Sequence, residues 1–243
     1  MNIKPFFNVN LDVLKVIALI SMTIDHIGHI LFPGEYVYRV IGRLSFPLFA
    51  FLIVTHLVQK GIFKKYLKRI LFFAFISSLL ILPYKKMFFP SYTLNILWSF
   101  FLSISAIVLI EKIFKESMQK WLKYFTAFFV ILILGGLSVL TDYQFEGFIY
   151  ILTLYGFLKT RKRIYLISCL LFSFLINFSN FSINPLMTTC FATTGFLTTT
   201  FLLLQHQPPH KKQIHFLKPW WIFYIYLPFH TVLLYVIKIK YVM

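Results

Sequence analysis

The sequence predicts an all-α fold, a polytopic integral membrane bundle of about nine helices, with one transmembrane domain over residues 1–243. Apolar residues make up 59% of the chain and charged residues only 13%, whereas soluble domains are typically about 25% charged. Apolar runs of the length that crosses a bilayer, about 20 residues, follow one another along the chain. Because no long linker interrupts them, we expect a single domain surrounded by lipid.

The apolar runs predict nine spans. They are residues 12–32, 37–58, 66–84, 92–110, 122–140, 144–158, 164–181, 184–205 and 219–237. The sixth is short, and little separates the seventh from the eighth, so counts of eight or ten remain open.

Basic residues are concentrated in alternate loops. These loops hold Lys60, Lys64, Lys65, Lys68 and Arg69; Lys112, Lys115, Lys120 and Lys123; Lys159, Arg161, Lys162 and Arg163; and Lys211, Lys212 and Lys218. Such loops face the cytoplasm, which predicts that the N-terminus lies inside and the C-terminus outside. A net charge of +17 would indicate nucleic acid in a soluble protein, but here we expect no nucleic-acid partner.

The first span carries an unusual set of ionisable residues, Lys15, Asp25, His26 and His29. Such groups are costly inside a membrane and by default mark a functional site. Lys15 and His26 are eleven positions apart, which places them on nearly the same helix face at 100° per residue. His29 shares that face and Asp25 lies beside it, so this face is expected to point into the protein.

The second span places Arg39 and Arg43 in its outer half, with Arg43 at about the depth of Asp25. We therefore expect an Asp25–Arg43 ion pair, which neutralises both charges and keeps the two helices in register. His26 would then be available for chemistry. The alternative is that these residues only hold helices together.

A basic run, Lys64, Lys65, Lys68 and Arg69, opens the third span on the predicted cytoplasmic side. Its members are spaced i, i+4 and share a helix face. Such a cluster can hold the phosphates of a nucleotide or coenzyme. The alternatives are a topology signal alone or contact with anionic lipid.

Four further polar residues are candidates for the site: Asn95, Asp142, Tyr143 and His230. Asn95 and Ser99, one turn apart, are expected to form hydrogen bonds between helices, and Tyr143 fits an aromatic belt. His230 is a second histidine at membrane depth. No metal is expected, because no zinc or haem spacing occurs.

The segment from Leu14 through Asp25-His26-Ile27-Gly28, followed by Arg39 to Phe51, resembles the opening signature of the TraX family. The basic run, Asn95 with Ser99, Asp142-Tyr143, and Tyr226 to His230 continue that pattern in order. The resemblance spans nearly the whole chain and is most specific in the first two spans.

This resemblance implies an acetyltransferase of the bacterial cytoplasmic membrane that takes acetyl from cytoplasmic acetyl-CoA. The TraX family is named for a protein that acetylates the N-terminus of conjugative pilin, and related acyltransferases have a basic residue eleven positions before a first-span histidine, as Lys15 and His26 are. The catalytic residues would be His26, Asp25 and Arg43, and the coenzyme would contact Lys15 and the basic run. Those acyltransferases also have a pair of arginines, three positions apart at the cytoplasmic face, that is thought to hold the coenzyme. Lys65 and Lys68 match this pair only loosely, since they have its spacing but are not arginines.

The acyl acceptor is left open by the sequence: a protein N-terminus, a glycan or a lipid-linked species all fit. Two other classes of function also stay open. One is a transporter whose polar stripe lines a proton or solute path. The other is a non-enzymatic assembly subunit of a conjugation or secretion system.

Overall fold

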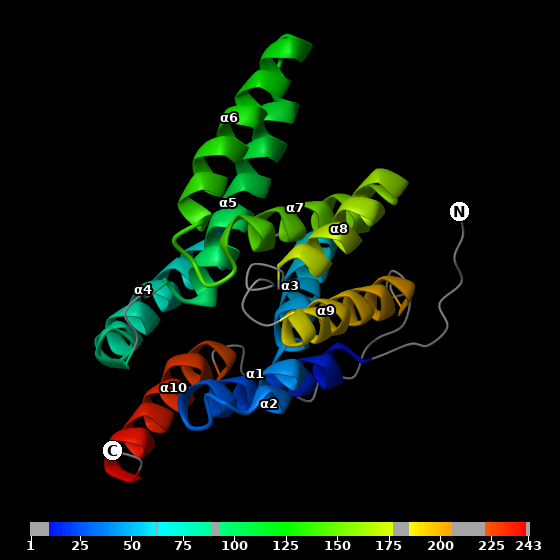
Figure 1. The fold of residues 1–243 in the computed structure, drawn as a ribbon. Helices are drawn as coiled ribbons and strands as arrows, with labels where there is room; N and C mark the ends of the chain where they lie inside the picture. Colours follow the sequence, from blue (N-terminus) through cyan, green and yellow to red (C-terminus); the bar gives the residue numbers. More distant parts are fainter. Residues whose placement is uncertain (1–9, 62, 89–92, 177–184, 206–221, 242–243) are drawn as a thin grey trace. The chain divides into compact units, whose positions relative to one another are not determined.

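The computed structural model describes residues 10–61, 63–88, 93–176, 185–205 and 222–241. Within these ranges the chain forms α-helices and no strand, which confirms the predicted all-α class (Figure 1). It divides into two compact units, residues 1–59 with 173–243, and residues 60–172. The prediction of a single domain stays a prediction.

Within the described residues every predicted span overlaps a helix, and the second overlaps two; residues 92, 177–181, 184 and 219–221 of the predicted spans lie outside the described residues. The helices are α1 (Leu11–Ile30), α2 (Tyr36–Gly42), α3 (Ser45–Lys60), α4 (Phe63–Phe88), α5 (Ile96–Lys115), α6 (Lys120–Ser138), α7 (Gln144–Thr160), α8 (Arg163–Leu175), α9 (Pro185–Gln205) and α10 (Ile222–Tyr241).

Six segments of the described chain are long and apolar enough to cross a bilayer, so the protein is a multi-pass membrane protein. They are Leu11–Ile30, Tyr36–Gln59, Lys64–Met87, Ile96–Lys115, Lys120–Ser138 and Pro185–Leu204. The count of nine is not confirmed: α7 and α8 have only 17 and 13 residues, and the 20-residue α10 is not among the six segments. The last predicted basic loop, with Lys211, Lys212 and Lys218, lies outside the described residues.

The second predicted span is not one continuous helix. Proline at position 47 has no N–H to donate to the carbonyl of Arg43, and its ring would clash there. The chain therefore turns at Arg43 and Leu44, whose N–H groups bond back to Arg39 and Ile41 respectively. Ser45 Oγ donates to the Gly42 carbonyl, 2.8 Å away, and α3 then begins.

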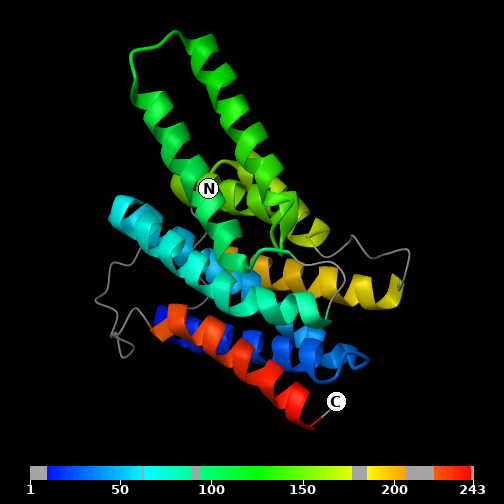
Figure 2. The ribbon, with the colours of Figure 1, turned by 90° about the vertical axis from the view of Figure 1, so that its left-hand side faces the viewer.

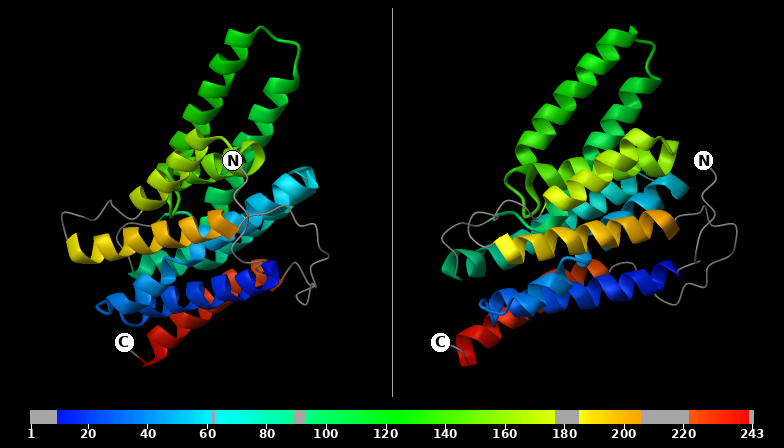
Figure 3. Two further views of the ribbon diagram at one scale, coloured as in Figure 1. Left: turned by 90° about the vertical axis from the view of Figure 1, so that its right-hand side faces the viewer. Right: turned by 45° about the vertical axis from the view of Figure 1, so that its right-hand side comes forward.

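In the first unit, α1 packs against both α2 and α10, and α2 also contacts α9. Figures 2 and 3 show α10, the last helix, running alongside α1, the first. Residues some 200 positions apart in the sequence are thereby brought together.

In the second unit, α5 packs against α4, α6 and α7. Leu102 and Ala106 of α5 are buried with Phe148 of α7. The outer face of α6 is different: Trp121 and Phe128 are 64% and 59% exposed. Large apolar side chains on such a face fit contact with lipid tails.

Candidate functional site

The first turn of α1 holds one of the predicted site residues, Lys15, in an ion pair. Asn10 caps the helix by accepting from the backbone N–H of Asp12 at 2.8 Å. Asp12 is fully buried, and its Oδ1 lies 2.6 Å from Lys15 Nζ. Lys15 thus compensates a buried carboxylate three residues away.

Asp25, nearly three turns further along α1 and beside the predicted polar face, is bound by both arginines of the second span. Its Oδ2 lies 2.8 Å from Arg39 Nη1 and its Oδ1 lies 3.2 Å from Arg43 Nη2. The predicted Asp25–Arg43 pair is therefore confirmed, and Arg39 joins it. The Asp25 and Arg43 side chains are each only 13% exposed. Arg43 also stacks over the Phe191 ring of α9, 5.0 Å from its centroid.

Two glycines allow α1 and α2 to approach closely around this ion-pair cluster. A Cβ added at Gly42 would overlap the Asp25 carboxylate, and one added at Gly28 would overlap the Tyr38 side chain. One turn before Asp25, Ser21 Oγ donates to the Ile41 carbonyl at 2.6 Å. Glycine at position 42 is therefore what lets the carboxylate meet both guanidinium groups.

His26, the residue after Asp25, faces α10 instead. Its Nδ1 lies 2.7 Å from His230 Nε2, and the two ring planes are 12° from parallel. Thr231 Oγ1 lies 3.3 Å from the same His26 Nδ1. His26 is therefore hydrogen-bonded to α10 through Nδ1. The sequence-based prediction, which left His26 available for chemistry, did not include this bond.

The contact between α1 and α10 has a second polar bond, one turn away. Tyr226 OH lies 2.6 Å from Thr23 Oγ1. Since the Thr23 hydroxyl donates to the Leu19 carbonyl, the tyrosine hydroxyl is the donor. Thr23 and His26 are three residues apart and Tyr226 and His230 are four apart, so each pair lies on one helix face.

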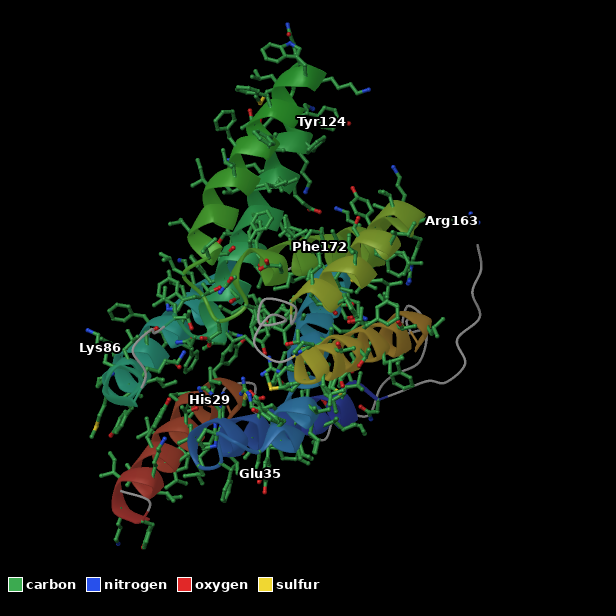
Figure 4. All side chains as sticks on the ribbon, in the orientation of Figure 1. His29, Glu35, Lys86, Tyr124, Arg163 and Phe172 are labelled. Atoms are coloured by element: carbon green, nitrogen blue, oxygen red, sulfur yellow. The ribbon has the colours of Figure 1, made fainter. Side chains whose placement is uncertain are left out.

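The remaining predicted residue of α1, His29, is partly buried in the last turn of the helix. Figure 4 labels it together with Glu35, on either side of the turn that joins α1 to α2.

The basic run opens α4 in the second unit. Its four side chains are exposed: Lys64, Lys65, Lys68 and Arg69. An exposed set of cations at i, i+4 spacing has the charge and spacing that several phosphate oxygens require.

The other predicted candidates in the second unit form a separate polar cluster. Asn95 caps α5 by accepting from the Leu97 N–H, and its side-chain amide donates to Ser78 Oγ at 3.1 Å. Ser99 Oγ donates to Thr141 Oγ1 at 2.8 Å. The expected hydrogen bond of Asn95 to a neighbouring helix is therefore confirmed, whereas the partner of Ser99, Thr141, lies between α6 and α7 and not in a helix.

Asp142 belongs to this cluster through its carboxylate. Its Oδ1 lies 2.8 Å from Lys85 Nζ and also accepts from the Thr93 hydroxyl. Lys85 follows the third predicted span at its outer end, away from the predicted cytoplasmic loops, and Asp142 compensates its charge. Tyr143 precedes α7, and its carbonyl accepts from Gly147 N–H.

Sequence reasoning identified His26, Asp25, Arg43 and His230 but did not join the two histidines. It missed Thr23, Thr231 and Gly42. The sequence did contain a signal for Thr23. Thr23 with His26 in the first span and Tyr226 with His230 in the last are polar pairs at helical spacing, and such pairs can bond to each other when the two helices pack. The partner helix itself could not be read from the chain.

Comparison with known proteins gives a family match over most of the chain. A family model described as TraX protein matches residues 10–238. An uncharacterized protein of Rickettsia prowazekii (strain Madrid E) is 32% identical over 136 residues, 52% of this chain and 55% of that protein.

A probable fimbrial assembly protein, FimC of Dichelobacter nodosus, is 41% identical over 69 residues, 27% of this chain and 28% of that protein. The chain thus spans about half of the first curated relative and less of the second. No solved structure matches it significantly.

Proposed function

This chain belongs to the TraX family, and on that premise we propose that it is a membrane-embedded acetyltransferase of pilus assembly. It would transfer acetyl from cytoplasmic acetyl-CoA to an acceptor amine or hydroxyl at or across the cytoplasmic membrane. The alternate basic loops support an N-terminus inside and a C-terminus outside.

The observation that carries the proposal is the pairing of two chemically different sites on adjacent residues of α1. Asp25 lies between two guanidinium groups, 2.8 and 3.2 Å away. His26 meets a second imidazole at 2.7 Å. Interhelical packing alone requires neither two arginines for one carboxylate nor two histidines in contact, and both are costly in a bilayer.

In the proposed reaction His26 acts as the general base. It removes a proton from the acceptor amine or hydroxyl as the acceptor attacks the thioester carbon. The bond from the acyl carbon to the acceptor forms, the carbon–sulfur bond breaks, and the proton passes to the leaving thiolate. The alternative course is a brief acetyl-imidazole on His26.

The ion-pair cluster supplies electrostatic stabilisation. One carboxylate opposed by two guanidinium groups leaves a net charge of +1. A fixed positive charge in a water-poor site stabilises the negative charge that develops on the thioester oxygen. In this role Arg39 and Arg43 stabilise charge, and Asp25 orients them.

The basic run is the proposed contact for the coenzyme phosphates, and its exposure and i, i+4 spacing support this. For the acceptor we propose the N-terminal amine of a pilus subunit. The similarity to a protein named as a probable fimbrial assembly protein supports that class.

Isothermal titration of acetyl-CoA into detergent-purified protein tests the proposal. We expect micromolar binding that is lost when Lys64, Lys65, Lys68 and Arg69 are replaced by alanine. The matched control removes four exposed lysines at or near the ends of other helices, Lys112, Lys115, Lys120 and Lys162, and should keep binding.

A transfer assay with radiolabelled acetyl-CoA and a pilin N-terminal peptide completes the test. We expect acetyl-peptide with wild type. No coenzyme binding and no transfer by folded protein would reject the acetyltransferase, and proton flux in liposomes would then favour a transporter.

A further inference from the structure

We propose that His230 is a positioning residue, which holds His26 in the one tautomer whose Nε2 can take a proton. The proposal rests on the proposed function for its chemistry. The hydrogen bonds that carry it are independent of that chemistry.

The direction of each hydrogen bond follows from the backbone. His230 Nδ1 lies within hydrogen-bond distance of the Tyr226 carbonyl, and a carbonyl oxygen can only accept. His230 therefore carries its proton on Nδ1. When its ring is uncharged, its Nε2 has no proton and must accept.

The proton between the two rings consequently belongs to His26. His26 Nδ1 donates to His230 Nε2 across 2.7 Å. An uncharged imidazole has one N–H, so His26 Nε2 is left as a bare lone pair. This is the nitrogen that a general base or a nucleophile must use.

Neighbouring groups reinforce this arrangement. The Thr231 hydroxyl donates to the Leu227 carbonyl at 2.8 Å, so its oxygen is an acceptor toward His26 Nδ1. The Tyr226 ring stacks on His230 with centroids 4.6 Å apart. His230 is 5% exposed, so little water competes for its nitrogens.

The pair can also share the proton that the reaction delivers. When Nε2 takes a proton from the acceptor, the Nδ1 proton of His26 can move to His230 Nε2. No proton is lost or gained, and the positive charge spreads over two rings. The reverse shift returns the proton through Nε2 to the leaving thiolate.

Two substitutions at one position separate positioning from packing. His230→Leu removes the acceptor, whereas His230→Gln offers a carbonyl oxygen at similar reach. We expect kcat to fall by about 100-fold or more in His230→Leu, the range that a general base contributes. His230→Gln should restore most of the rate.

Thr23→Val is the matched control, because it removes the neighbouring interhelical bond to Tyr226 and leaves both histidines in place. Its kcat should stay within about threefold of wild type, a shift below about 0.7 kcal/mol. Equal kcat in His230→Leu and wild type, with both folded, would overturn the proposal.

A spectroscopic measurement separates this inference from the proposed function. In protein labelled with 15N-histidine, with His26→Asn used for assignment, we expect a protonated Nδ1 and an unprotonated Nε2 at His26. His230→Leu should lose that preference. A protonated Nε2 in wild type would reject the inference even if acetyl transfer occurs, whereas the expected tautomer without transfer would reject only the proposed function.

Discussion

The ion-pair cluster of the first unit and the polar cluster of the second unit balance charge in different ways. Asp25 is opposed by two arginines, whereas Asp142 forms an ion pair with a lysine, Lys85. The first site adds two imidazoles in contact. The second adds an amide and hydroxyls, which donate to one another and to backbone carbonyls.

The difference separates chemistry from packing. Amides and hydroxyls in hydrogen-bonded sets hold membrane helices together at moderate cost. Charged side chains and titratable rings are far more costly there. We therefore expect substitutions in the first cluster to affect transfer, and those in the second to affect stability alone.

The largest contrast should come from His26→Ala and Ser99→Ala. Loss of a general base lowers kcat by about 100- to 10,000-fold, so we expect His26→Ala to abolish measurable transfer while the protein stays folded. Ser99→Ala should keep kcat within a few-fold. The measurement is single-turnover acetyl transfer, with circular dichroism to verify folding. Wild-type rates in His26→Ala would end the assignment.

The second contrast compares the stability lost when the aspartate of each cluster is replaced by alanine. Asp25→Ala leaves two arginines without their carboxylate, and breaking a buried pair costs about 3–5 kcal/mol. Asp142→Ala breaks a more exposed pair, which is worth about 0–1 kcal/mol. Chemical unfolding in detergent measures both. Similar losses for the two variants would show that the clusters are energetically alike.

A third contrast compares two glycines. Gly42→Ala forces a Cβ into the Asp25 carboxylate, which should destabilise by about 1–3 kcal/mol. A Cβ at Gly136 meets nothing within 4 Å, so Gly136→Ala should stabilise its helix by about 0.5–1 kcal/mol. Thermal unfolding of the two single variants tests this. A neutral Gly42→Ala would show that α2 can move away from α1.

The smallest contrast is expected between two variants at the start of α5. Asn95→Ala removes a helix cap, at a cost of about 0.5–2 kcal/mol. Asn95→Asp keeps the acceptor for the Leu97 N–H and loses the donor to Ser78. Hydrogen exchange at the first turn of α5 distinguishes them. Equal protection in all three proteins would mean that the cap contributes nothing.

Much of this organisation was predictable from local patterns. Apolar runs placed a helix in each expected range, because a chain in lipid must satisfy its backbone within helices. Helical spacing placed Lys15, His26 and His29 on one face. Asp25 could be paired with Arg43 because the two residues lie at about the same depth in their predicted spans. The break after Gly42 was not predicted, although Pro47 carried its cause.

Local patterns did not predict which helices pack against one another. The sequence by itself specified the membrane class, the helices and the ionisable residues of α1, since these follow from composition and periodicity. Only the tertiary structure brought α10 to α1, and with it His230 to His26. Partners some 200 residues apart depend on how whole helices pack, and no short-range pattern encodes that contact.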